Sequence, residues 1–376
     1  EDHPVYCRPL ISYYLEKKTD PERMNYRSAD FYKKMGCDVF YGKKSIRIDA
    51  DSKKVVLDDG AELSYTEVCV ATGSAPFVPS FEGLDTVEKK FSFMTLDDTF
   101  ALEKAINKDS KVLIVGAGLI GLKCAEGLHG RVASITVCDL ADRVLSSILD
   151  TDCAAIVQRH LEANGIQFLL GDTAVRFEKN LAQMKSGKTV EFDALVLAVG
   201  VRANTTLVKD IGGEVNRGIL VNDRMETSLE SIYAAGDCTE GNDISLGQKR
   251  VLALLPNAYM QGHTAGVNMA GGNEVFGKAI PMNSIGFFGL HIMTAGTYVG
   301  EMYEEKSDST LKRLFTKDGL LKGFILIGKT ERAGIYTSLI RERTPLDTID
   351  FETMKKVATS VAFSPENRRK KFGGVV

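Results

Sequence analysis

Residues 111–128, KVLIVGAGLIGLKCAEGL, decide the fold of this protein. An apolar strand leads into Gly116-Ala117-Gly118-Leu119-Ile120-Gly121, and a helical pattern follows at once. In such a motif the first glycine permits a tight turn and the second lets a pyrophosphate approach the backbone. The third lets helix and strand pack closely, and the helix N-terminus faces the anion. The motif therefore predicts a dinucleotide site; the alternative is tight helix–strand packing alone.

An acidic residue after the motif supports the dinucleotide interpretation. Asp139 ends the next predicted strand, SITVCD (134–139), 18 residues after Gly121. A carboxylate at this place accepts hydrogen bonds from an adenosine ribose, whereas NADPH sites carry an arginine just past the strand. Here the nearest cation is Arg143, and the neighbouring Asp142 partly offsets its charge. The sequence therefore predicts NADH rather than NADPH.

The pattern on both sides of the motif predicts an α/β fold with a doubly wound domain. Strand-like segments alternate with helical ones, and the turn Asp59-Gly60 indicates a hairpin. The predicted helices span 29–35, 95–107, 119–130, 150–164 and 256–269. The hairpin is predicted at 54–63, and the predicted strands lie at 38–42, 45–50, 66–76, 111–116, 134–139, 166–171 and 194–200. Mixed strands and helices follow, and the charged tail 366–376 is predicted to be a frayed terminus.

Composition limits the class of protein. The chain has 376 residues, of which 44% are hydrophobic and 26% charged, as in a globular protein of two or three domains. A net charge of −3 argues against a nucleic-acid partner. No apolar run approaches the roughly 20 residues of a membrane span, and the charged start, Glu1-Asp2-His3-Pro4, is unlike a signal peptide. We expect a cytoplasmic protein.

The cysteines and histidines show no metal-binding spacing. The seven cysteines contain no C-x-x-C pair, which argues against a zinc ribbon, a disulfide framework and an internal redox dithiol. Several of them lie in apolar runs, where a small buried residue is expected. The five histidines are scattered, and three lie on predicted helices. We predict no metal site and a reducing compartment.

Four motifs occur in an order that resembles a known family. They are ATGSAP (71–76), the glycine motif, AVGVRAN (198–204) and TSLESIYAAGDC (227–238). Together they resemble the FAD- and NAD-dependent pyridine nucleotide-disulfide oxidoreductases, which have two dinucleotide-binding domains. The segments PVYCRPLISYYL (4–15) and RAGIYTSLIRERTPLD (332–347) resemble the NADH:rubredoxin reductase and nitrite-reductase-like branch.

The resemblance implies an FAD/NAD(P)-binding Rossmann-like two-domain flavoprotein fold with a C-terminal α+β interface domain. The expected parts are the first part of an FAD domain (1–106), an NAD domain (107–226), the second part of the FAD domain (227–272) and the interface domain (273–376). The family's first glycine motif, which binds the FAD pyrophosphate, is not in the sequence. We therefore expect the chain to lack the first βαβ unit of its FAD domain.

The resemblance also implies the cofactor-binding residues. On the FAD side these are Arg8 and Pro9 beside the isoalloxazine, Val39 at the adenine, Ala71, Thr72 and Gly73 at the phosphates, Gly236 and Asp237 at the ribityl phosphate, and Ala258 at the pyrimidine end. On the NAD side they are Gly116, Gly118, Leu119, Ile120, Gly121, Asp139 and Gly200. The alternatives are turn and strand packing, a surface ion pair for Arg8 and a solvated turn acid for Asp237.

Two positions depart from the family pattern. Cys7 lies close to the redox cysteine of disulfide-using relatives, but one residue out of register. Lys123 stands where many relatives carry an acid that meets the nicotinamide amide. Glu126, one turn further along the same predicted helix face, is expected to pair with Lys123.

The function implied is that of an NADH-dependent flavoprotein reductase. A hydride passes from NADH to FAD, and electrons pass on to a separate acceptor such as rubredoxin, a ferredoxin or a partner redox subunit. No catalytic side chain is assigned, because the flavin itself performs the difficult step. A homodimer through the C-terminal domain is also implied. Two alternatives stay open: an NADH oxidase or thiol-disulfide reductase using Cys7, and a non-catalytic nucleotide-binding subunit of a larger redox complex.

Overall fold

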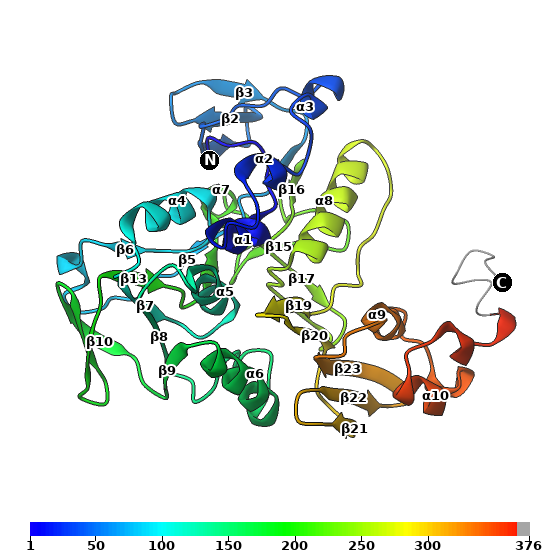
Figure 1. The fold of residues 1–376 in the computed structure, drawn as a ribbon. Helices are drawn as coiled ribbons and strands as arrows, with labels where there is room; N and C mark the ends of the chain where they lie inside the picture. The colour runs from blue at the N-terminus through cyan, green and yellow to red at the C-terminus, as the bar shows by residue number, and fades with distance from the viewer. Residues whose placement is uncertain (367–376) are drawn as a thin grey trace. The chain divides into compact units, whose positions relative to one another are not determined.

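A computed structural model describes residues 1–366, which form two compact units (Figure 1). Unit 1 contains Glu1–Ser64 and Ala75–Arg202, and unit 2 contains Tyr65–Ser74 and the chain from residue 203 onward. Except for Glu366, the predicted charged tail lies outside the described residues. No helix in residues 1–366 is long and apolar enough to cross a membrane.

A five-stranded parallel sheet organises unit 1, in the order β6-β13-β7-β8-β9. Its strands are β6 (Lys90–Phe91), β7 (Lys111–Val115), β8 (Ser134–Asp139), β9 (Ile166–Leu170) and β13 (Ala194–Leu197). All four residues of β13 are buried, as expected of a parallel strand covered on both faces. The strand order reverses between β7 and β13, and ligands of such sheets bind at this switch point.

The predicted helices around this sheet are confirmed. They are α4 (Leu96–Ala105), α5 (Leu119–Leu128) and α6 (Thr151–Ala163), and Figure 1 shows α5 and α6 beside the sheet. Local sequence sets where α4 and α6 begin. Thr95 and Asp98 form a capping box at α4, and the Asp150 side chain accepts a hydrogen bond from the N–H of Cys153 at α6.

An antiparallel meander was not predicted. It consists of β10 (Ala174–Glu178), β11 (Leu181–Met184) and β12 (Thr189–Glu191). Phe177 and Met184 pack with Leu113 and Leu195 of the parallel sheet in one apolar cluster. Strands β10 and β11 are only partly buried and β12 has no buried residue, so the segment lacks the continuous apolar run that marked the parallel strands.

The N-terminal segment of unit 1 contains short elements. They are α1 (Ile11–Leu15), α2 (Pro21–Met24), α3 (Phe31–Lys34), β1 (Ser45–Asp49), β2 (Lys54–Leu57) and β3 (Glu62–Ser64). The predicted hairpin turn at Gly60 is confirmed, with a φ of 84°. The strand predicted at 38–42 is wrong: this described stretch is irregular, and Val39, Phe40 and Tyr41 are exposed. An apolar run becomes a strand only where a neighbouring strand pairs with it.

Unit 2 begins with a parallel pair, β4 (Val68–Val70) and β16 (Ile232–Ala234). The predicted long helix is α8 (Leu255–Met269). Smaller elements are α7 (Thr206–Lys209), β15 (Ile219–Leu220), β17 (Thr239–Asp243) and β18 (Gln248–Arg250). Two further strands lie where the chain passes from one unit to the other: β5 (Ser74–Pro76) and β14 (Val201–Ala203).

The C-terminal part of unit 2 is the predicted α+β structure. Its antiparallel sheet has the order β19-β20-β23-β22-β21. The strands are β19 (Met282–Phe287), β20 (Leu290–Gly296), β21 (Glu301–Lys306), β22 (Leu311–Lys317) and β23 (Leu320–Ile327). Helix α9 (Ala333–Arg341) packs on β20 and β23, and α10 (Phe351–Lys356) follows. The buried Tyr336 of α9 donates its hydroxyl hydrogen bond to the carbonyl of Met354, which joins the two helices.

Candidate functional site

Backbone packing explains two of the three motif glycines. Gly116 has a φ of 118°, and a Cβ there would lie 2.3 Å from the carbonyl oxygen of Ala198. A Cβ on Gly121 would lie 1.9 Å from the carbonyl oxygen of Gly116. Around Gly118, in contrast, a Cβ would meet no atom within 4 Å. The tight turn predicted at Gly116 and the close packing predicted at Gly121 are confirmed, and the approach of a pyrophosphate at Gly118 stays a prediction.

The glycine turn and Gly200 lie at one edge of the sheet. Gly118 caps α5 without any side-chain hydrogen bond, and Leu119 and Ile120 form the first, partly exposed turn. Gly200 follows β13, next to β7, and has a φ of 111°. The N–H groups of the first turn of α5 therefore have no side-chain cap at the switch point. This is the arrangement that suits an anionic nucleotide.

Asp139 is fixed against the glycine turn. The N–H of Ala117 donates to Oδ2 of Asp139 at 2.7 Å, and the N–H of Ala141 donates to Oδ1 at 2.8 Å. Because each carboxylate oxygen accepts more than one hydrogen bond, both oxygens keep capacity for a ribose hydroxyl. The backbone around Asp139 thus holds its carboxylate, which is predicted to bind the ribose, beside the motif.

Arg143 is held by its own loop. Its Nη1 lies 2.8 Å from Oδ1 of Asp142, and its Nε donates to the carbonyl of Leu149 at 3.1 Å. The guanidinium is therefore already engaged and partly neutralised. This agrees with the expectation that Arg143 does not serve a 2′-phosphate.

Lys123 pairs with Glu126, as predicted from their spacing. The ammonium of Lys123 also lies 5.0 Å from the centre of the Tyr13 ring, at cation–π distance. Both charged side chains are largely buried, at 18% and 7% exposure. Lys123 is therefore directed toward α1, the segment that by resemblance lies on the flavin side.

Helix α1 is anchored to α5 and α4, a relationship that the sequence did not reveal. A Cβ on Gly127 of α5 would lie 3.0 Å from Cβ of Leu15. Arg131 donates to the carbonyl of Leu15 at 2.7 Å and to Oε1 of Glu103 at 2.8 Å. The hydroxyl of Tyr14 donates to the other oxygen of Glu103 at 2.7 Å. Charged and aromatic contacts thus fix α1 within unit 1.

Three predicted residues near the N-terminus have plainer surroundings. Arg8 lies 3.2 Å from a carboxylate oxygen of Glu1, so the surface ion pair weighed for it is present. Pro9 is within a short 3-10 helix, Arg8–Leu10. Val39 is exposed on the irregular stretch.

Partial burial raises the pKa of the Cys7 thiol, and so disfavours the thiolate that redox chemistry needs.

The remaining predicted residues come together in unit 2. Ala71, Thr72 and Gly73 follow β4, and Gly236 and Asp237 follow its partner β16. The first turn of α8 lies beside Gly236, because a Cβ on Gly236 would lie 3.6 Å from Cβ of Ala258. These residues therefore form one cluster at the carboxyl ends of two parallel strands.

Hydrogen bonds connect this cluster. Ser74 donates its hydroxyl hydrogen bond to Oδ2 of Asp237 at 3.4 Å. The hydroxyl of Thr72 donates to the carbonyl of Asn204 at 2.8 Å, and the side-chain amide of Asn204 donates back to the carbonyl of Thr72 at 2.8 Å. Gly236 has a φ of 82°, a conformation that favours glycine.

Gln261 is a residue that sequence reasoning missed. Its side-chain oxygen accepts hydrogen bonds from the N–H of Gly236 at 2.9 Å and from the hydroxyl of Thr239 at 3.2 Å. It thereby fixes the Gly236 turn. A usable signal was present: polar residues at helical spacing, all buried on one side of α8, namely Asn257, Gln261, Thr264 and Asn268.

The cysteines and possible metal ligands are scattered in the structure as well. Within residues 1–366, no group of three or more His, Cys, Asp or Glu side chains is placed to hold a metal ion. All seven cysteines are free thiols. Burial raises the pKa of Cys69 to about 11 and that of Cys138 to about 12, so these thiols stay protonated at neutral pH.

Comparison with known proteins finds one matching family model and several similar chains. The family model described as pyridine nucleotide-disulphide oxidoreductase matches residues 1–262. The epsilon subunit of NADH-dependent phenylglyoxylate dehydrogenase from Aromatoleum evansii is 32% identical over 359 residues, which cover 92% of this chain and 84% of that subunit. The assimilatory nitrate reductase electron transfer subunit of Bacillus subtilis (strain 168) is 32% identical over 356 residues. That match covers 91% of this chain but only 45% of the Bacillus protein.

A solved structure shares the fold. The reductase in the covalent putidaredoxin reductase–putidaredoxin complex superposes with a TM-score of 0.86. The match covers 96% of this chain and 89% of that chain, at 21% sequence identity. At this identity the likeness concerns the fold.

Proposed function

The chain belongs to the pyridine nucleotide-disulphide oxidoreductase family, and from this premise we propose that it is an NADH-dependent FAD oxidoreductase that passes electrons to a separate redox protein. The family, the fold class and the cofactors FAD and NADH predicted from the sequence are confirmed. The individual binding residues and the acceptor are the proposal.

One observation carries the NADH part. Asp139 is hydrogen-bonded to Ala117 inside the glycine turn, at the switch point of the parallel sheet. Gly118 leaves the backbone open to a pyrophosphate, and the uncapped first turn of α5 faces it. The carboxylate is then in place to accept the ribose hydroxyls. The residues therefore fit an NADH molecule laid across the edge of the sheet.

The cluster in unit 2 fits the FAD side. Asp237, held by Ser74, and the turn at Gly236, held by Gln261, follow β16 beside the residues after β4. The first turn of α8 supplies N–H groups and the positive end of a helix dipole. FAD, when bound, supplies hydride acceptance and one-electron transfer. The protein residues bind and orient it, and no side chain has to act as acid or base.

A separate acceptor is favoured by the state of the cysteines. The pKa of Cys7 is raised rather than lowered, and the chain has no C-x-x-C pair. A relative named as an electron transfer subunit supports the same role. We propose that the acceptor is a small iron–sulfur protein, such as rubredoxin or a ferredoxin, or a partner redox subunit.

Anaerobic turnover tests this function. The FAD-loaded protein and NADH are mixed with rubredoxin, with a ferredoxin, or with a disulfide substrate, and reduction is followed optically. We expect reduction of a one-electron protein acceptor and little disulfide reduction. Efficient disulfide reduction, or peroxide formation in a parallel assay in air, that disappears in Cys7→Ser would instead establish the thiol-dependent alternative. Tight NADH binding without reduction of bound FAD would support the non-catalytic subunit.

The arrangement of parts is also proposed. We propose that 1–106 and 227–272 belong to an FAD domain, 107–226 to an NAD domain and 273–376 to an interface domain through which two copies associate. Light scattering measures the oligomeric state of the whole chain. We expect a dimer, and we expect a variant with added charged residues on the interface domain to be a monomer.

A further inference from the structure

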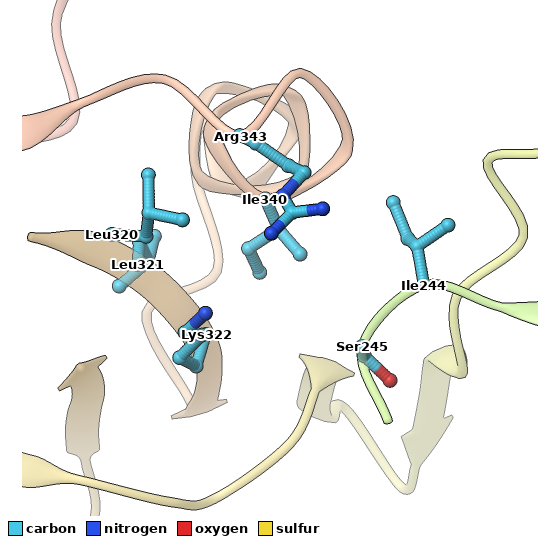
Figure 2. Close-up of a pocket in the computed structure, with 7 residues that line it drawn as sticks. All are labelled: Ile244, Ser245, Leu320, Leu321, Lys322, Ile340 and Arg343. Carbon is cyan, nitrogen blue, oxygen red and sulfur yellow. The ribbon is translucent and has the colours of Figure 1, made fainter. Parts of the chain in front are cut away.

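A small hollow lies in unit 2, and none of the residues that line it is among those assigned to FAD and NADH (Figure 2). Its volume is about 20 Å³, enough for one water-sized atom. Three separate elements build it: the turn after β17, the start of β23 and the end of α9. The lining residues are Ile244, Ser245, Leu320, Leu321, Lys322, Ile340 and Arg343.

Two cationic side chains border this hollow. Figure 2 shows that Arg343 comes from the end of α9 and Lys322 from β23, and both line the hollow. In the part of the chain that the structure describes, neither makes an ion pair or a side-chain hydrogen bond. Apart from Ser245, the remaining walls are apolar, which strengthens the repulsion between two like charges.

The acid next to the hollow is already neutralised. Asp243, at the end of β17, accepts hydrogen bonds from the N–H and hydroxyl of Ser245. Its other oxygen lies 2.9 Å from Nε of Arg250. Asp243 and Arg250 thus balance each other, and the charges of Lys322 and Arg343 are left over.

The backbone of Arg343 provides a second, independent observation. Helix α9 ends in a Schellman motif: the N–H of Thr344 donates to the carbonyl of Leu339 at 3.0 Å, and the N–H of Arg343 donates to that of Ile340 at 3.2 Å. The position of Arg343 has a φ of 48°, where glycine is usual. The Schellman motif itself accounts for this left-handed conformation. Here the left-handed residue brings an arginine side chain to the rim of the hollow.

We propose that this hollow binds one oxyanion group, a carboxylate or a phosphate. The planar guanidinium of Arg343 and the ammonium of Lys322 supply the donors that such a group prefers. One oxygen enters the hollow, and the rest of the group stays at the surface beside the exposed Arg343. The bound group relieves the repulsion between the cations and ties the three elements together.

Thermal melting of the FAD-loaded protein tests the site. Acetate and phosphate are titrated separately at constant ionic strength, with chloride as the balancing salt. We expect at least one oxyanion to raise the Tm by about 2–4 °C over chloride, and Lys322→Met to remove that rise. The acetate and phosphate arms show which group is preferred. Lys278→Met, which removes an exposed lysine of the same unit, keeps the full response.

Arg343→Gly gives the sharpest comparison. Glycine relieves the left-handed backbone, so this variant should melt at or above the parent protein in chloride. Its Tm should nevertheless not rise when the oxyanion is added. The Tm of the parent protein should therefore approach or overtake that of Arg343→Gly as the oxyanion concentration increases. Arg343→Lys, which keeps the charge, should retain part of the response. Equal rises in the parent protein, Lys322→Met and Arg343→Gly, or no rise in the parent protein, would overturn the proposal.

Discussion

Asp139 and Ala117 are joined by a 2.7 Å hydrogen bond from the Ala117 N–H to the Asp139 carboxylate. The bond connects the end of β8 to the glycine turn after β7. It therefore fixes the residue predicted to bind the ribose next to the turn predicted to bind the pyrophosphate. The carboxylate holds the turn, and we propose that it also selects the nucleotide.

NADH should be preferred over NADPH by at least about tenfold in kcat/KM, a difference of about 1.4 kcal/mol. A 2′-phosphate would meet the Asp139 carboxylate, and unit charges about 4 Å apart interact by roughly 4 kcal/mol near a surface before screening. Asp142→Asn removes the carboxylate that partly neutralises Arg143 and should narrow the preference for NADH. Steady-state rates with a dye acceptor measure both. Equal or better use of NADPH by the unaltered chain would refute the assignment of Asp139.

Alanine at the motif glycines should separate folding from binding. Gly121→Ala places a Cβ 1.9 Å from the Gly116 carbonyl oxygen, so we expect a marked loss of Tm. Gly118→Ala meets no protein atom within 4 Å and should fold normally, yet it should weaken NADH binding about tenfold or more. Melting curves and NADH titrations check both variants. Unchanged NADH affinity in Gly118→Ala would mean that the pyrophosphate lies elsewhere.

Asp237→Ala should lower the affinity for FAD more than the affinity for NADH. Asp237 belongs to the cluster after β4 and β16, whereas the NADH residues surround β7 and β13. Fluorescence titration with each nucleotide measures the two affinities, and Asp210→Ala serves as an acid replaced elsewhere in unit 2. Equal losses of both affinities in Asp237→Ala would indicate a purely structural acid.

Cys7→Ser should leave NADH-dependent dye reduction within about twofold of the parent rate. Burial raises the pKa of Cys7, so the reactive thiolate is scarce at neutral pH. The pH profile should accordingly show no step near neutrality that disappears in this variant. Loss of most of the activity, or of such a step, would restore a redox role for the thiol.

Glu103→Gln should destabilise the protein at neutral pH and much less in acid. Burial alone would raise the pKa of Glu103, but hydrogen bonds from Lys17, Tyr14 and Arg131 outweigh it and lower the pKa below 4.5. A lowered folded-state pKa adds stability above the unfolded value, and this contribution is lost as pH falls through the folded value. Urea unfolding at neutral pH and below pH 4.5 measures the difference. Replacing the exposed Glu88 by glutamine should leave the free energy of unfolding equal to that of the parent protein at both pH values. A loss of unfolding free energy in Glu103→Gln that persists in acid would contradict the assignment.

Sequence by itself determined the elements whose causes are local or periodic. The glycine positions 116 and 121, the caps Thr95 and Asp150, and the apolar strands β7, β8 and β13 follow from spacing and side-chain chemistry within a few residues. The Lys123–Glu126 pair is of the same kind, because helical spacing alone brings the two together. The family resemblance added the order of the motifs.

Tertiary structure alone decided the contacts between distant segments. The stretch 38–42 is apolar yet irregular, because whether a strand forms depends on a partner that local sequence does not specify. Arg131 reaches Leu15 across 116 residues, and Gln261 reaches back 25 residues to hold Gly236. The hollow beside Arg343 joins three separate elements. Such contacts depend on how chain segments pack in three dimensions, which neither periodicity nor local spacing encodes.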